Sequence, residues 1–312
     1  MTSLAKRRSR RRRQSLGKRL VLTERDLAIF RTLARYRYLR STYLHAFAGG
    51  ASETRFKERL GDLFHEGYVD RPEPQWQFAD GRFSPAIHEL AQRGRRLLLT
   101  REPLPAPLTF LNGSVHRQFL HGLMICEVLA SLELAIAARP DVRFLGWPDI
   151  LARAPLQTQS ATMPFRLPLG SASLVPDALF GLEYSHGNER KYRFFAVEAD
   201  RGTMPIRRTA GLQTSLMAKL ASYQQALQQQ AFRTHWGIPN LMVMTVVQTQ
   251  ERLAAVTAAA ARELGDERAF LFKLFMDRSD TGLSHRPNPA CFLAPYQRAS
   301  SAPFSIIDAA KT

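Results

Sequence analysis

Two neighbouring stretches indicate the fold of the second half of this chain: Leu174-Val-Pro-Asp-Ala-Leu-Phe-Gly-Leu182 and Tyr192-Arg-Phe-Phe-Ala-Val-Glu-Ala-Asp-Arg201. Both are short and apolar, and turn-forming residues 185–188 separate them, which predicts two paired β-strands. Asp177 opens the first strand and Glu198 lies near the end of the second. A carboxylate inside an apolar strand is costly unless something pairs with it, so these two residues mark a candidate chemical site.

Two carboxylates on adjacent strands can jointly hold a hard divalent cation such as Mg²⁺. We therefore expect Asp177 and Glu198 to converge as metal ligands. Asp200 should project from the same strand face as Glu198, because alternate residues share a face. The alternative is a hairpin stabilised by ion pairs, with a surface helix beside it.

The composition indicates a basic protein with two domains. The chain has 312 residues, more than one average domain, and its 44 Lys and Arg against 27 Asp and Glu give a net charge of +17. Such an excess favours an anionic partner, and we expect DNA. The two cysteines are far apart, as in a reducing cytoplasm. We expect no apolar run to reach the 18 or so residues that cross a bilayer, so no membrane partner is expected.

Nine of the positive charges lie in the first nineteen residues. Residues 1–20 are therefore predicted to be a disordered basic arm that binds phosphates through Arg10, Arg11, Arg12 and Arg13. The alternative is a solvated tail that contributes only to solubility.

Residues 21–100 have the pattern of a small DNA-binding domain. Thr23 and Asp26 form a capping box at the start of a first helix, a second helix begins at Ser41, and Ser52 caps a third that ends at Gly67. Short strands are expected at residues 68–71 and 86–90, then a helix at 91–99. Three helices followed by a hairpin is the order of a winged helix-turn-helix, in which the third helix enters the major groove.

The expected DNA contacts of this domain are the outward residues of the third helix and one residue of the wing: Thr54, Arg55, Glu58, Arg59, Asp62 and Arg82. The alternative is a three-helix module that binds protein.

A proline-rich linker at 101–113 leads to an α/β domain at 114–276, and an irregular tail at 277–312 follows. In this domain we expect a helix at 114–138, a strand at 142–147, the two site strands, a helix at 214–230 and a strand at 241–247. A helix at 250–264 and a strand at 270–276 extend the mixed central sheet. Glu127 or Glu133 is a candidate to point from the long helix toward the site strands.

The α-β-β-β-α-β order and the acidic strands resemble the PD-(D/E)xK nuclease-like fold. Asp177 and Glu198 match its two acidic positions, whereas Asp200 stands where the family has its lysine. In some branches of that fold the lysine lies on the following helix, as Lys219 does here. The resemblance implies catalytic roles for Asp177, Glu198, Lys219 and Asp200, with Mg²⁺ or Mn²⁺ as cofactor, in a DNA endonuclease or nickase.

The whole pattern is similar to the replication-relaxation family of plasmid and mobile-element proteins. The resemblance depends on Leu22-Thr-Glu-Arg-Asp26, Leu60-Gly-Asp-Leu-Phe-His-Glu-Gly67, Leu90-Ala-Gln-Arg-Gly94, Val175-Pro-Asp177, Val197-Glu-Ala-Asp-Arg-Gly-Thr203 and Lys219-Leu-Ala-Ser-Tyr223. It implies a DNA-binding protein that acts in replication, mobilisation or their control.

The substitution at Asp200 leaves a non-catalytic alternative open: a transcriptional regulator or replication initiator in which the nuclease-like domain is only a scaffold. A tyrosine recombinase or relaxase is not favoured, because no Tyr accompanies a clustered His triad. The sequence allows a homodimer and leaves protein partners open.

Overall fold

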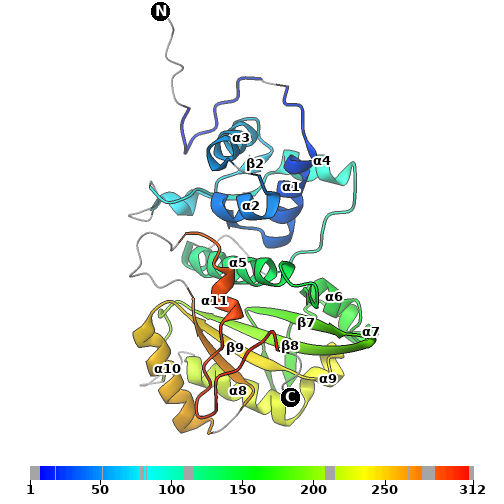
Figure 1. The fold of residues 1–312 in the computed structure, drawn as a ribbon, viewed down its shortest axis with the longest axis vertical. Coiled ribbons are helices and arrows are strands. Elements are labelled where there is room, and N and C mark those ends of the chain that lie inside the picture. The colour runs from blue at the N-terminus through cyan, green and yellow to red at the C-terminus, as the bar shows by residue number, and fades with distance from the viewer. Residues whose placement is uncertain are drawn as a thin grey trace, which may run out of the picture. The chain divides into compact units, whose positions relative to one another are not determined.

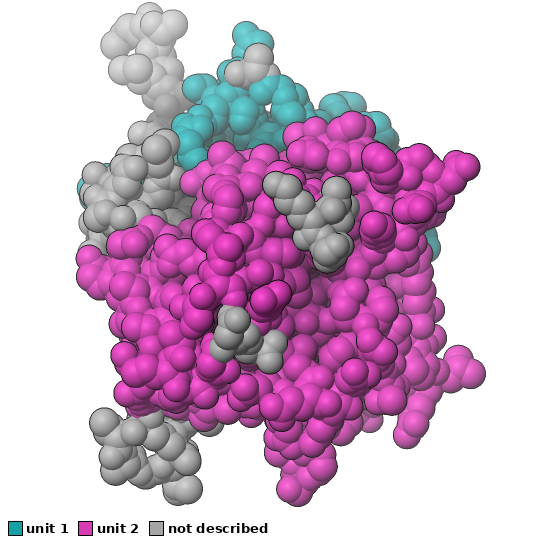
Figure 2. Space-filling view, turned by 60° about the horizontal axis from the view of Figure 1, so that its bottom comes forward, with its two compact units in different colours: residues 1–107, 114–127, 285–287 teal, residues 108–113, 128–284, 288–312 magenta. Residues whose placement is uncertain are grey.

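The computed structural model describes residues 8–17, 19–50, 52–77, 81, 83–108, 116–207, 215–265, 268–275 and 285–308. The protein has a mixed α+β fold and divides into two compact units (Figure 2). Unit 1 comprises residues 1–107, 114–127 and 285–287, and unit 2 comprises residues 108–113, 128–284 and 288–312.

Residues 1–107 of unit 1 form four α-helices, one 3-10 helix and a small antiparallel sheet within the described residues (Figure 1). Its elements follow in the order α1 (Glu24–Tyr36), β1 (Leu39–Arg40), α2 (Ser41–Ala48), α3 (Glu53–His65), β2 (Val69–Asp70), the 3-10 helix η1 (Glu73–Gln77), β3 (Ile87–Leu90) and α4 (Gln92–Leu99). The strand order is β1-β3-β2. The two-residue strand β1 was not expected, because it is too short to show the alternation of a strand.

The helix ends in unit 1 form where the sequence placed them. The capping box of Thr23 and Asp26 is confirmed, and the backbone N–H of Arg55 donates to Ser52 Oγ at 3.3 Å, which confirms the cap of α3. Gly67 follows α3 with φ of 82°, a left-handed conformation in which a glycine avoids strain. These signals are local, so sequence alone was sufficient.

The basic arm differs from the prediction of disorder. Residues 8–17 run along unit 1, where Arg11 donates to the carbonyl of Trp76 at 3.3 Å and Arg13 donates to that of Phe64 at 2.9 Å. Arg10 and Arg11 also lie over the Trp76 ring, each 5.7 Å from its centroid. Backbone carbonyls and aromatic rings therefore bind these guanidinium groups. These partners lie far from the arm in the sequence, so a local sequence pattern does not predict the contacts.

Unit 2 contains a five-stranded mixed sheet with the order β10-β9-β8-β7-β4. The strands β4 (Val142–Leu145), β7 (Ala178–His186) and β8 (Glu189–Asp200) are antiparallel, and β9 (Met242–Val247) and β10 (Phe270–Leu274) continue parallel to β8. The long helix α5 (His116–Ala137) contributes to both units. Strands β5 (Leu167–Leu169) and β6 (Ala172–Leu174) form a separate hairpin. The remaining helices are α6 (Trp147–Leu151), α7 (Leu156–Gln159), α8 (Leu216–Gln228), α9 (Ala231–Trp236), α10 (Gln250–Glu263) and α11 (Pro289–Leu293).

Helices cover both faces of this sheet. In Figure 1, α8, α9 and α10 lie on one face of the sheet, and α11 and the C-terminal end of α5 lie on the other. The core on the first face joins Ala196 of β8 to Leu220 of α8 and Val256 of α10. On the other face Phe180 stacks on Phe195 with ring centroids 5.0 Å apart. Alternate residues of β8 thus face different helices, as the pleat requires.

Two sequence-based expectations for unit 2 need correction. The stretch Phe119–Ala137 of α5 is 19 residues long with a mean hydropathy of 1.8, which is enough to cross a bilayer, yet 78% of it is buried inside the structure. That burial matches a core helix, which passes the same test of length and composition. The tail expected to be irregular contains α11, and its Tyr296 and Ile306 are buried. Residues 276–284 and 309–312 lie outside the description.

Candidate functional site

Asp177 lies where the backbone pairing of β7 with β8 stops. Its own N–H donates to the Val197 carbonyl at 3.1 Å, and the preceding residue, Pro176, has no N–H to donate. The side chain continues the ladder: the backbone N–H of Ala199 donates to Asp177 Oδ2 at 2.8 Å. This bond fixes the carboxylate at the carboxyl end of β8.

Glu198 and Asp200 occupy that same end of β8, on the face covered by α8 and α10. They continue the alternation of Phe194 and Ala196, which belong to the core on that face. Glu198 is only 3% exposed. A carboxylate so buried requires donors from the helices above it.

Lys219 of α8 brings the two predicted carboxylates together. Its Nζ lies 2.5 Å from Glu198 Oε2 and 3.3 Å from Asp177 Oδ1. Tyr223, one helical turn later, donates its hydroxyl proton to Glu198 Oε1. The sequence analysis assigned no role to Tyr223. Residues four apart lie on the same face of a helix, so the assignment of Lys219 to the site could also have identified Tyr223.

Burial controls the electrostatics of this cluster. Burial raises the pKa of Glu198 above its ordinary value, and the charge of Asp177 adds to this rise, while Lys219 and Tyr223 oppose it. Burial acts against the charge of Lys219, but Glu198 and Asp177 outweigh it and raise the pKa of the ammonium. Burial and Glu198 hold the pKa of Tyr223 well above its usual range, so its hydroxyl remains a donor.

Asp200 does not join this cluster. Its Oδ2 accepts from Arg252 Nε of α10 at 2.7 Å, and its Oδ1 accepts from the backbone N–H of Gly202 at 2.8 Å. Arg252 also donates to the Met204 carbonyl at 2.6 Å, which ties the loop after β8 to α10. Asp200 therefore has a structural ion pair, which the 52-residue separation concealed.

Glu127 does not reach the site strands either. It is buried in unit 1, where Arg40 Nε lies 2.8 Å from its Oε1. Burial raises the pKa of Glu127, and the charge of Arg40 opposes that rise.

The donors around Asp177 and Glu198 suit the ammonium group of Lys219 better than a metal ion. All four carboxylate oxygens of Asp177 and Glu198 already have donors: Lys219 contacts one oxygen of each, and Ala199 and Tyr223 bind the other two. Among the described residues, no three His, Cys, Asp or Glu side chains are grouped closely enough to hold a metal ion. The Lys219 ammonium takes the bridging place that a shared divalent cation would need.

The third helix presents a narrower surface than the sequence predicted. Thr54, Arg55 and Glu58 are exposed on α3, as expected. Arg59 Nη2 instead lies 2.6 Å from Oδ2 of Asp26, a residue of α1, and donates to the Val21 carbonyl at 2.7 Å. It is a structural residue, because the Asp26 side chain is only 1% exposed.

The remaining predicted DNA contacts have different surroundings. Asp62 of α3 pairs with Arg8 of the arm. Arg10 donates to the Ser84 carbonyl at 2.9 Å, whereas Arg12 is exposed. Arg82, placed on the wing by the sequence, lies outside the described residues.

Comparison with known proteins identifies a family. The family model described as replication-relaxation matches residues 30–241, and the chain belongs to this family. Membership indicates a role in the replication or mobilisation of a plasmid or mobile element. No curated protein and no solved structure gives a match.

Proposed function

We propose that this protein binds DNA through unit 1 and acts there in the replication or mobilisation of a mobile element. The order α1-β1-α2-α3-β2-β3, with the sheet order β1-β3-β2, is the observation that carries the proposal. This order supports a winged helix-turn-helix, in which the third helix would read the major groove. Thr54, Arg55 and Glu58 are the exposed side chains in the reading position.

The charge of unit 1 supports the same proposal. Residues 1–107 contain 23 Lys and Arg against 11 Asp and Glu, so most of the net positive charge of the chain lies in this third of the sequence. Positive charge concentrated on one domain attracts the phosphate backbone and increases the association rate.

The test is selection of duplexes from a random library by the full chain. We expect enrichment of a preferred sequence, and loss of discrimination at one position in Arg55→Ala, because a bidentate contact to a base is worth about 1–3 kcal/mol. Equal binding of all duplexes by both proteins would contradict base reading. Absence of duplex binding would contradict the proposal as a whole.

For unit 2 we propose a nuclease-like fold that serves as a scaffold. Its helix, three antiparallel strands, helix and parallel strand follow the PD-(D/E)xK order, with Asp177 and Glu198 at the acidic positions. The ammonium of Lys219 balances one negative charge of this acidic pair from within the chain, and burial raises the pKa of Glu198, which favours its neutral form. A cluster that is neutralised internally is stable without a bound cation.

A metal-dependent DNA nuclease is the second candidate, and the convergence of Asp177, Glu198 and Lys219 is the observation that favours it. Supercoiled plasmid incubated with Mg²⁺ or Mn²⁺ distinguishes the two candidates. The scaffold predicts no nicking above that of a Glu198→Ala control. Nicking by the natural protein that the control lacks would establish the nuclease.

A further inference from the structure

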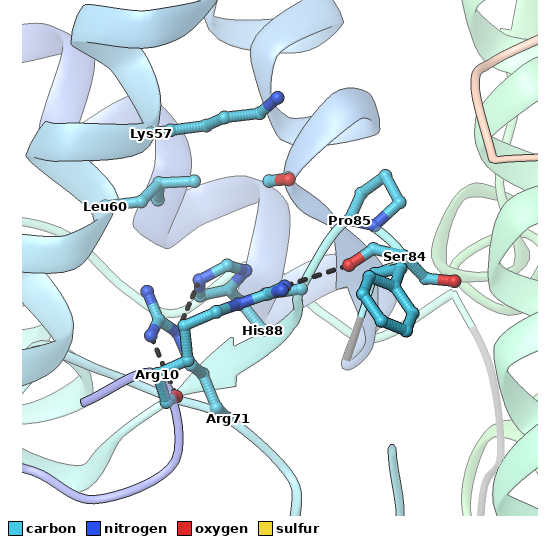
Figure 3. Close-up of a pocket in the computed structure, with 10 residues that line it drawn as sticks. Arg10, Lys57, Leu60, Arg71, Ser84, Pro85 and His88 are labelled. Atoms are coloured by element: carbon cyan, nitrogen blue, oxygen red, sulfur yellow. Dashed lines mark hydrogen bonds between the residues drawn. The ribbon is translucent and has the colours of Figure 1, made fainter. Parts of the chain in front are cut away.

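Unit 1 contains a cavity of about 330 Å³ whose walls are strongly basic. We name it the basic cavity. Arg10 of the arm, Lys57 of α3 and Arg71 after β2 line it, together with Leu60, His88 and residues 83–86 before β3. Figure 3 shows Lys57 and Leu60 extending from α3, with Arg10 and Arg71 below them and Ser84 and Pro85 opposite. The described lining residues include three cationic side chains and no carboxylate.

Arg71 is the least compensated of these cations. Its Nε donates to His88 Nε2 at 3.2 Å, its Nη1 donates to the Arg10 carbonyl at 3.0 Å, and its guanidinium lies over the Phe64 ring, 4.3 Å from the centroid. All of these acceptors are uncharged. No carboxylate of the described residues lies within ion-pair distance of the Arg71 guanidinium.

The pKa shifts agree with an excess of positive charge here. Burial, with the charges of Arg10 and Arg8, lowers the pKa of Arg71 to about 10. An arginine nevertheless keeps its proton at neutral pH, so the cavity keeps its charge. Burial and the charge of Arg71 also lower the pKa of His88, which leaves the imidazole a neutral acceptor.

The other cations differ in how far they are neutralised. Lys57 Nζ lies 2.8 Å from Glu53 Oε1, but Glu53 also accepts from Arg286 Nη2 at 2.9 Å, so two cations share one carboxylate. Arg10 adds a further positive charge to the lining, and its side chain donates to the Ser84 carbonyl at 2.9 Å. An anion that entered the cavity would therefore meet the positive charge of Arg71 and the partly neutralised charge of Lys57.

The dimensions and the rim indicate what kind of anion fits. A volume of about 330 Å³ is at the lower end of the range of small-molecule sites and exceeds the needs of a bare ion. Guanidinium forks match phosphate oxygens. Phe83 lines the cavity and is 90% exposed, which provides a free aromatic face on which a base can stack.

We propose that the basic cavity binds one nucleotide through its phosphate, either as a free nucleotide or as a nucleotide of a DNA strand. Free nucleotide binding is independent of whether Thr54, Arg55 and Glu58 read bases. It would add a second, sequence-independent contact to the proposed reading helix.

The experiment is calorimetric titration of the full chain with deoxyadenosine monophosphate and with deoxyadenosine. We expect saturable binding of the monophosphate only. Lys57→Gln should weaken it at least about tenfold, the effect of losing one hydrogen bond to a charged group. Lys57 is largely exposed, so this variant should fold. Arg95→Gln removes one exposed charge of the same unit outside the cavity and should bind as the natural protein does.

Salt titrations of duplex binding distinguish the two sources of the phosphate. If DNA supplies it, Lys57→Gln lowers the log–log salt slope by roughly 0.9, the value for one phosphate, and Arg95→Gln does not. Monophosphate binding without this change identifies a free nucleotide. No monophosphate binding and an unchanged slope in Lys57→Gln would overturn the inference. Loss of duplex binding with intact monophosphate binding would contradict only the proposed function.

Discussion

The charged clusters of the two units differ in how their charges are balanced. In unit 2 one ammonium, that of Lys219, meets the carboxylates of Asp177 and Glu198, and every carboxylate oxygen has a donor. In unit 1 the basic cavity gathers three cations, and no carboxylate is among its described lining residues. One cluster is complete within the chain, and the other has positive charge left over for an external anion.

This difference separates a structural role from a binding role within one molecule. Internally satisfied charges stabilise the fold and resist rearrangement, because removal of one partner leaves another buried and unpaired. Unsatisfied charges reduce stability but become favourable contacts when a ligand of opposite sign arrives. On this basis we propose that unit 1 binds nucleic acid and that unit 2 supports it.

The largest expected effect is on stability, from Lys219→Met. This change removes the cation that Asp177 and Glu198 share, and loss of one partner of a buried ion pair costs about 3–5 kcal/mol. Urea unfolding followed by circular dichroism measures the change. The control Lys191→Met, at an exposed position of β8, should change the free energy of unfolding by less than about 0.5 kcal/mol. Equal stability of both variants would show that the cluster is not internally balanced.

A smaller effect is expected from Arg59, which the sequence predicted to be a DNA contact and which pairs with Asp26 in the structure. Arg59→Ala should lower the free energy of unfolding by about 1–3 kcal/mol, because the buried Asp26 carboxylate of α1 would lose the guanidinium group that donates to it. Arg55→Ala, one turn earlier on α3, should leave that free energy within about 0.5 kcal/mol. Thermal unfolding of the two variants side by side decides the point. A more severe loss in Arg55→Ala would reverse the assignment of their roles.

The pH dependence of the Glu198 cluster gives a more gradual effect. Because the folded-state pKa of Glu198 is raised, the folded chain holds a proton that the unfolded chain releases above a pH of 4.5. The free energy of unfolding, measured relative to Glu198→Gln, should therefore fall as pH rises above 4.5, by at most about 1.4 kcal/mol per pH unit. Urea unfolding at several pH values between 4.5 and 8 measures the trend. A relative stability that rises with pH would mean that Lys219 lowers the pKa of Glu198 overall.

Sequence predicted the parts of this structure that depend on near neighbours. The capping box of Thr23 and Asp26 involves residues three apart, and the strand pattern placed Asp177 and Glu198 at one end of the sheet. The convergence of Lys219 followed from the resemblance to a known fold. Tyr223 was missed because its position four residues after Lys219 was not used.

The failures of sequence reasoning concern partners far apart in the chain. Arg59 has an exposed-looking position on α3, yet its partner Asp26 lies 33 residues earlier. The sequence analysis grouped Asp200 with Glu198 because the two residues share a strand face. In the structure the Asp200 carboxylate instead accepts a hydrogen bond from Arg252 of α10. Neither partner can be identified from spacing, because only the packing of helices brings these side chains together.

The most direct test of the contrast between the two units is a duplex-binding titration of the full chain with two single variants. We predict that Arg55→Ala weakens binding by about 1–3 kcal/mol, whereas Glu198→Gln, which alters the cluster of unit 2, binds as the natural protein does with or without Mg²⁺. Unchanged binding by Arg55→Ala together with Mg²⁺-dependent weakening in Glu198→Gln would contradict the account and place the DNA contact in unit 2.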